Sequence, residues 1–130
     1  MISKKLFFTL FIFVVLFIVS SCQIKAQSAV YFCTETGAFG FAYGYSTVRE
    51  AKDAAYDACK DYGGTNPSLV TSTSNKGYGA IAIGTDANDS RIIGAALGYK
   101  YLSDAKSEAI RICKEYGGED VEIKNTFNDE

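Results

Sequence analysis

The chain has 130 residues, enough for one domain with a modest core, and a formal net charge of −2. Its 13 Lys and Arg residues form no cluster along the sequence, which argues against nucleic acid as a partner. There is no histidine, so the usual general base near neutral pH and the commonest transition-metal ligand are both missing; we expect no catalytic centre, bound metal or cofactor.

Residues 1–21 are predicted to be a signal peptide. A basic start, Lys4 and Lys5, precedes an apolar run over residues 6–19, which is shorter than the roughly 20 residues that cross a bilayer. Cys22 follows this run directly, as in bacterial lipoprotein signals, where the cysteine carries the lipid. The alternative is an ordinary cut after Ala26.

We therefore expect an exported protein. If Cys22 is lipidated, the chain is a lipoprotein of the periplasm, outer membrane or cell surface, and this lipid is its only attachment to a membrane. If the cut follows Ala26, the protein is secreted.

A first unit is predicted over residues 29–74, after a linker over 22–28. Residues 29–33 form a short apolar run typical of a strand, and the polar residues 34–37 predict a hairpin connection. Residues 38–45 alternate between aromatic side chains and Gly or Ala, which indicates a strand with one large and one small face.

A helix is predicted next in this unit. Thr47 and Glu50 have the spacing of a capping box at its start, and Gly63 and Gly64 are expected to end it. A polar strand over residues 69–74 closes the unit. One stripe of the helix is expected to be buried: Val48, Ala51, Ala55, Ala58, Cys59 and Tyr62.

The second unit, residues 78–127, has the same order. Strands are predicted over 79–83 and 91–99, with a longer polar loop between them, and a closing strand over 120–127. Ile93, Leu97 and Tyr99 are expected on the large face of the second strand. The expected buried stripe of its helix is Leu102, Ala105, Ala109, Ile112, Cys113 and Tyr116.

The two units match at a spacing of 54 residues without a gap. Gly40, Ala42, Gly44 and Tyr45 recur as Gly94, Ala96, Gly98 and Tyr99, and Ala51, Cys59 and Tyr62–Gly64 recur as Ala105, Cys113 and Tyr116–Gly118. The predicted fold class is therefore α+β: two tandem ββαβ repeats forming an antiparallel sheet of about six strands, with two helices side by side on it. The sequence leaves open which sheet face the helices cover.

These motifs resemble an uncharacterised family of exported bacterial domains. The shared pattern is a Gly/Ala/aromatic hairpin followed by a helix of the form A-x3-A-x3-C, given twice; here the helices contain Ala51-x3-Ala55-x3-Cys59 and Ala105-x3-Ala109-x3-Cys113. The resemblance covers about residues 29–125. It implies an architecture and no activity, and it supplies no disulfide map, because the cysteine that often follows each helix in such domains is missing here.

Three cysteines, Cys33, Cys59 and Cys113, follow Cys22. A catalytic thiol would need a base, and spacings of 26 and 54 match no zinc-binding pattern, so we expect buried thiols with room for one disulfide. The stretch 86–90 has Asp, Asn and Ser at the alternate positions of a calcium loop. Arg91 and Leu97 stand where such a loop needs Gly and Glu, so we expect a solvated hairpin loop.

The aromatic strand face has two interpretations. It is either core or a surface on which a sugar or peptide stacks, and the candidate residues for a ligand face are Phe39, Phe41, Tyr43, Tyr45 and Tyr99. The expected function is a non-enzymatic envelope module that binds a protein, peptide or glycan. The alternatives are a carboxylate-dependent hydrolase and a structural or stress-related surface protein.

Overall fold

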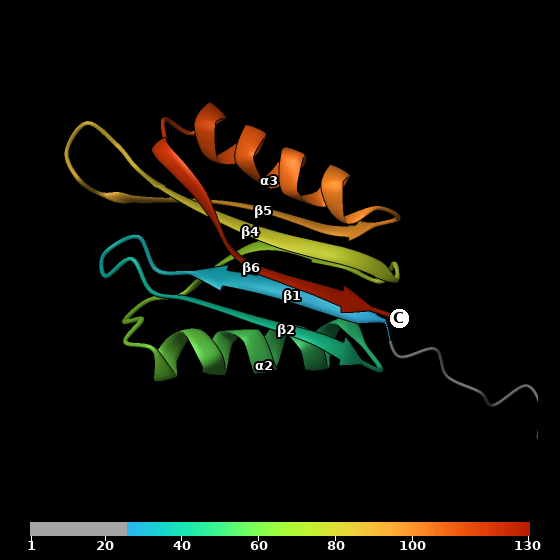
Figure 1. The fold of residues 1–130 in the computed structure, drawn as a ribbon. Helices are drawn as coiled ribbons and strands as arrows, with labels where there is room; N and C mark the ends of the chain where they lie inside the picture. Colours follow the sequence, from blue (N-terminus) through green and yellow to red (C-terminus); the bar gives the residue numbers. More distant parts are fainter. Residues whose placement is uncertain (1–25) are drawn as a thin grey trace, which may run out of the picture.

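The structure, a computed structural model, describes residues 26–130 (Figure 1). The expected signal peptide and the lipidation candidate Cys22 lie outside the described residues, as does most of the predicted linker. In the part of the chain that is described, no helix is long and apolar enough to cross a membrane.

The first unit contains three strands and one helix in the predicted order. They are β1 (Gln27–Phe32), β2 (Phe39–Tyr45), α2 (Val48–Asp61) and β3 (Ser68–Thr73). The second unit repeats this order with β4 (Gly77–Thr85), β5 (Arg91–Tyr99), α3 (Leu102–Glu115) and β6 (Glu119–Asp129). The α+β class and the two tandem ββαβ units are thus confirmed, with β1 starting two residues earlier than predicted.

The six strands are divided between two antiparallel sheets, in the orders β2-β1-β3 and β5-β4-β6. The expectation of one sheet with both helices side by side is therefore wrong. Figure 1 shows four layers: α2, the first sheet, the second sheet and α3. Each unit forms one sheet and one covering helix, so the duplicated units pack against each other through their sheets.

Large side chains fill the space between the two sheets. Val30 and Phe32 of β1 form one buried cluster with Ile81 and Ile83 of β4 and Ile93 of β5, and the half-buried Phe39, Phe41, Val70 and Leu97 pack against it. The faces that carry large side chains therefore meet between the two sheets. Each helix covers the opposite face of its own sheet. Burial of the large side chains is the main hydrophobic contribution to stability.

Small side chains lie between each helix and its sheet. Ala51 and Ala55 of α2, and Ala105 and Ala109 of α3, are fully buried against alanines of the strands. The approach is so close that a Cβ atom on Gly40 would overlap the backbone of α2 around Cys59; Gly94 lies against α3 in the same way. Glycine at these two strand positions is therefore required by the helix packing.

The helix ends follow the sequence signals, with one correction. The Thr47 hydroxyl accepts a hydrogen bond from the Glu50 N–H at 3.1 Å, and Gly63 at φ +97° follows the C-terminal end of α2. Tyr62 and Tyr116, which were expected on the buried stripes, are 77% and 71% exposed. Each is the C-terminal cap residue, where the helical path ends and the side chain leaves the sheet.

A bulge near the end of each second strand reverses its alternation. The register shifts where Gly44 and Gly98 adopt positive φ, +79° and +76°, which inserts one extra residue. Tyr99 consequently packs with the cluster under α3, so its predicted place on the large face with Ile93 is wrong. The same shift moves Tyr45 off the face that carries Tyr43.

Candidate functional site

Three aromatic rings stack along the line where β2 of one sheet meets β6 of the other. The Phe127 ring lies parallel to those of Tyr43 and Phe41, with centroid distances of 4.7 and 5.5 Å. Gly79, the partner of Phe127 in the β4–β6 ladder, gives this ring its space, because a Cβ there would collide with it. Phe127 is buried whereas Tyr43 is 47% exposed, so the stack runs from the core to the surface.

An open hollow of about 450 Å³ continues this aromatic line, and we call it the seam groove. β2, β6, the end of α2 and the start of β5 contribute to it. Its lining residues are Ala38, Phe39, Phe41, Tyr62, Arg91 and Asn125. Both units therefore build it, with aromatic rings from the first and polar side chains from the second.

Arg91 stands at the boundary between the seam groove and a second hollow of about 540 Å³. Its Nη1 donates a hydrogen bond to the Gly37 carbonyl oxygen at 2.9 Å, which orients the guanidinium. Within residues 26–130 no Asp or Glu forms an ion pair with it. The second hollow is lined by Phe32, Thr34, Leu69, Val70, Asp86, Ser90, Arg91, Ile92, Ile93 and Tyr116.

The two hollows are related by the duplication. Tyr62 lines one and its repeat partner Tyr116 lines the other, each just after its helix. Such exposed aromatic side chains beside a hollow are more typical of contact surfaces than of core.

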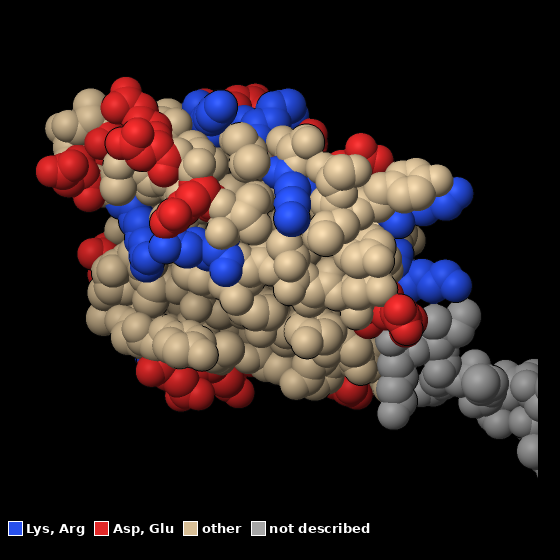
Figure 2. All heavy atoms as spheres, viewed as in Figure 1, with Lys and Arg blue, Asp and Glu red and all other residues tan. Residues whose placement is uncertain are grey.

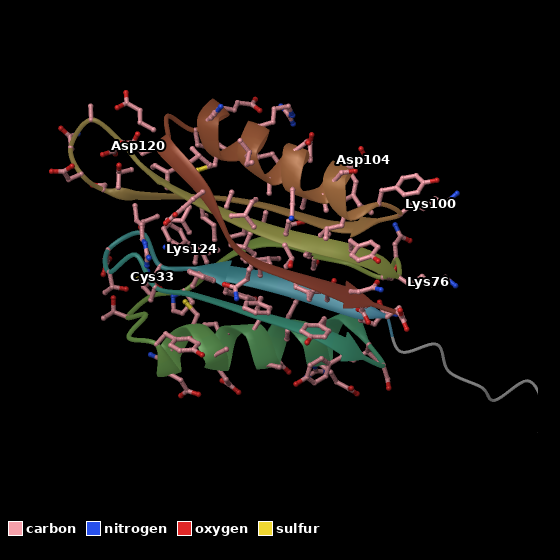
Figure 3. The ribbon with its side chains drawn as sticks, viewed as in Figure 1. Cys33, Lys76, Lys100, Asp104, Asp120 and Lys124 are labelled. Carbon is pink, nitrogen blue, oxygen red and sulfur yellow. The ribbon has the colours of Figure 1, made fainter. Side chains whose placement is uncertain are left out.

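Charge of both signs lies at this end of the molecule. Figure 2 shows acidic atoms gathered over the β4–β5 loop and the start of β6, with a Lys/Arg patch directly below them. Figure 3 places Lys124 in the region of that patch and Asp120 in the acidic part. Lys124 pairs with Glu122 at 2.6 Å, which lowers the pKa of that carboxyl.

Residues 86–90 lie in the hairpin loop between β4 and β5, as predicted, and residues 87–90 are exposed. One carboxylate oxygen of Asp86 accepts the N–H groups of Asn88 and Ser90, at 2.8 and 2.9 Å. Across the described part of the chain, no group of three or more acidic or Cys side chains is arranged to hold a metal ion.

The thiol of Cys33 lies in a polar surrounding at the β1–β2 turn. The Thr36 hydroxyl, then the Asn66 N–H and the Thr65 hydroxyl, lower its pKa to about 6. Thr65 Oγ1 is 3.6 Å from the sulfur and donates its hydrogen to Glu35 at 2.9 Å, so Thr36 and Asn66 contribute most to the lowered pKa. Burial instead raises the pKa values of Cys59 and Cys113.

The structure separates the five aromatic candidates. Phe39, Phe41 and Tyr43 lie along the β2–β6 line, while Tyr45 and Tyr99 follow the bulges and face elsewhere. Sequence reasoning missed Tyr62, Arg91 and Asn125 of the seam groove and Tyr116 of the second hollow. For the two tyrosines, the repeated Tyr-Gly-Gly was a usable signal, because the residue before a C-terminal Gly pair ends the helix.

Comparison with known families matches residues 27–128 to one described as "Domain of unknown function (DUF4189)". The chain belongs to this family. The match covers both ββαβ units, so a DUF4189 domain here is the whole four-layer structure. Searches of curated proteins and of solved structures each found no match.

Proposed function

We propose that this DUF4189 protein is an exported, non-enzymatic binding module, and that its ligand is an acidic glycan held in the seam groove. The observation that carries the proposal is Arg91, an oriented guanidinium that has no ion-pair partner within residues 26–130 and that opens onto aromatic-lined hollows on both sides. Guanidinium groups of this kind bind carboxylate or phosphate through two parallel hydrogen bonds.

The rest of the groove suits a sugar ring. Phe39, Phe41 and Tyr62 offer aromatic surface for the apolar C–H face of a saccharide, and the Asn125 amide can both donate and accept hydrogen bonds with hydroxyl groups. A volume of about 450 Å³ lies within the usual range for ligand sites, about 300 to 1,000 Å³. The exposed Tyr43 extends the aromatic line for a second sugar unit.

The same lining supports binding without catalysis. Among residues 26–130, no Asp or Glu lines the seam groove, whereas glycoside hydrolysis uses two carboxyl groups on either side of the scissile bond. The second hollow contains one, Asp86, and one of its oxygens already holds two backbone N–H groups. The carboxylate-dependent hydrolase therefore finds no support at this site.

Export is part of the proposal and rests on the sequence. The basic start, the short apolar run and Cys22 directly after it are the features of a lipoprotein signal, with cleavage after Ala26 as the alternative. An envelope location would bring the groove to the acidic and neutral glycans of the cell surface.

Calorimetric titration of the purified protein tests the ligand class. We expect polygalacturonate fragments to bind and neutral dextran fragments of equal length to bind much more weakly. Arg91→Gln should reduce affinity for the acidic fragments at least about tenfold, since hydrogen bonds to charged groups contribute about 1.5–3 kcal/mol. Lys106→Gln, an exposed change on α3, is the matched control. Equal binding of both polymers, or an unchanged affinity of Arg91→Gln, would overturn the proposal.

A further inference from the structure

Cys33 and Cys59 lie against the same backbone group. The Cys33 N–H donates to the Ala38 carbonyl oxygen at 2.8 Å, and the Cys59 thiol lies 3.5 Å from that oxygen. Both side chains are buried, in one cluster with Ala38. Figure 3 shows Cys33 at the end of the first sheet, close to the C-terminal end of α2. Two thiols from different elements are thus brought together.

The equivalent positions of the second unit indicate how close the Cys33 and Cys59 side chains lie. Its helix cysteine, Cys113, lies 3.5 Å from the carbonyl oxygen of Ile92, the repeat partner of Ala38, so the helix thiols occupy matching positions. Opposite Ile92 in the β4–β5 ladder stands Gly84, in the place that Cys33 has in the first unit. A Cβ built on Gly84 would lie 3.3 Å from the Cys113 sulfur.

If Cys33 and Cys59 have the same separation as these two positions, it suits a disulfide. The Cβ atoms of bonded cysteines lie about 3.5–4.5 Å apart, so a Cβ within contact distance of the partner sulfur requires only a side-chain rotation to form the bond. We propose that Cys33 and Cys59 are a disulfide site, oxidised together to a bond that joins the end of β1 to α2. Cys113 stays reduced, because its repeat unit has Gly84 at the partner position.

The surroundings of Cys33 make it the attacking thiol. Thr36 accepts the Ala38 N–H at 3.3 Å, which leaves its hydroxyl hydrogen free for the Cys33 sulfur, and the Asn66 N–H also faces that sulfur. Hydrogen bonds of this kind stabilise the thiolate, which is the reactive form. Cys59 is surrounded by apolar groups and reacts second.

The oxidant is a low-molecular-weight disulfide, RSSR, or a carrier protein with the same chemistry. The Cys33 thiolate attacks one sulfur of RSSR, forming a mixed disulfide and releasing RS⁻. The Cys59 thiolate then attacks the Cys33 sulfur and releases the second RS⁻. The two protons of the protein thiols end on two RSH molecules, so the protein loses two electrons and RSSR gains them.

The bond would fix the start of the β1–β2 turn. That turn supplies the Gly37 carbonyl oxygen to Arg91, and Ala38 and Phe39 of its far end line the seam groove. The oxidation state of the pair thereby acts on the backbone that positions the groove.

Thiol mapping of the full chain tests the site. The protein is recovered from an expressing bacterium and equilibrated with mixtures of reduced and oxidised glutathione. Exchange is stopped with acid, and the free thiols are then alkylated. The protein is digested and analysed by mass spectrometry. We expect one linked peptide pair, Cys33 to Cys59, with Cys113 alkylated at every ratio. Alkylation of both Cys33 and Cys59 in excess oxidised glutathione would overturn the proposal. So would a link from either thiol to Cys22, to Cys113 or to glutathione alone.

Two variants sharpen the result. Cys113→Ser should leave the Cys33–Cys59 link unchanged, and Cys33→Gly, which copies the second unit, should leave Cys59 fully alkylated. The unmodified chain already decides the question, so neither variant needs to retain full stability. A link that disappears in Cys113→Ser would contradict the assignment.

Discussion

Arg91 and Gly37, joined by a hydrogen bond of 2.9 Å from Nη1 to the carbonyl oxygen, occupy equivalent positions of the two repeats, 54 residues apart. Gly37 has φ +74°, and a Cβ there would lie 2.9 Å from Cδ of Arg91. Glycine in the first copy therefore makes room for arginine from the second. The two units thus differ at this position. The contact joins them where they form the seam groove.

The buried alanine stripes should not tolerate larger side chains. Ala55 and Ala109 are fully buried between helix and sheet, so Ala55→Leu and Ala109→Leu should each lower the free energy of unfolding by about 1–3 kcal/mol through overpacking. Asp57→Leu, on the exposed side of α2, should change it by less than about 0.5 kcal/mol. Denaturant midpoints at an unchanged slope measure the contrast. Equal effects of all three would contradict the helix packing described above.

Asp129 should make the protein less stable as the pH rises. The residue is 3% exposed, and burial raises the pKa of its carboxyl, partly offset by the N–H of Gly44. Since the folded state then binds the proton more tightly than the unfolded chain, this group lowers the free energy of unfolding between about pH 4, its unfolded pKa, and its raised folded pKa.

Asp129→Asn should remove that decrease and leave the variant more stable than the parent at neutral pH. Denaturant unfolding of both proteins across this range is the measurement. Stability curves that run parallel at all pH values would show that the Asp129 carboxyl titrates alike in both states.

In the reduced protein, the thiol of Cys33 should titrate before those of Cys59 and Cys113. With a pKa of about 6, Cys33 should give a rise in ultraviolet thiolate absorbance far below that of the two buried helix thiols, whose pKa values are raised. Cys33→Ser should abolish this early step, and Cys113→Ser should leave it in place. Because the folded pKa is lowered, Cys33 should also add stability as the pH rises from about 6 to about 9. An early step that survives in Cys33→Ser would assign it to another group.

The lipid anchor can be tested separately. If Cys22 is acylated, Cys22→Ala should leave the protein soluble after cell fractionation, or leave the leader uncut, while the parent stays with the membranes. A Cys33→Ala variant controls for the loss of a thiol. Equal membrane partition of Cys22→Ala and the parent, with the leader removed from both, would contradict a lipid anchor at Cys22.

Local structure was readable from the sequence because it depends on near neighbours. Thr47 and Glu50 marked the start of α2, the Ala51 and Ala55 spacing marked its buried side, and the 54-residue repeat predicted the second unit from the first. Period-two alternation identified β2 and β5 as strands but is the same whether the strands form one sheet or two. The division into two sheets depends on which faces meet, which is a long-range outcome.

The candidate site was less accessible to sequence reasoning. The placement of Tyr45 and Tyr99 turned on single-residue bulges at Gly44 and Gly98, where a glycine within a strand pattern is only a weak signal. Arg91 meets Gly37 only after the two sheets pack, so its role could not be seen from its neighbours in the chain. Sites formed between duplicated units are in general of this long-range kind.

The most direct test of the seam groove is to observe where a ligand binds. Backbone amide shifts of the ¹⁵N-labelled protein should be recorded by NMR during titration with short oligogalacturonate fragments. The account predicts that the largest shifts occur at residues 37–41, Tyr62, Arg91 and Asn125, and that they disappear in Arg91→Gln. Shifts centred on the outer faces of α2 or α3, or no shifts with the folded protein at millimolar fragment, would contradict it.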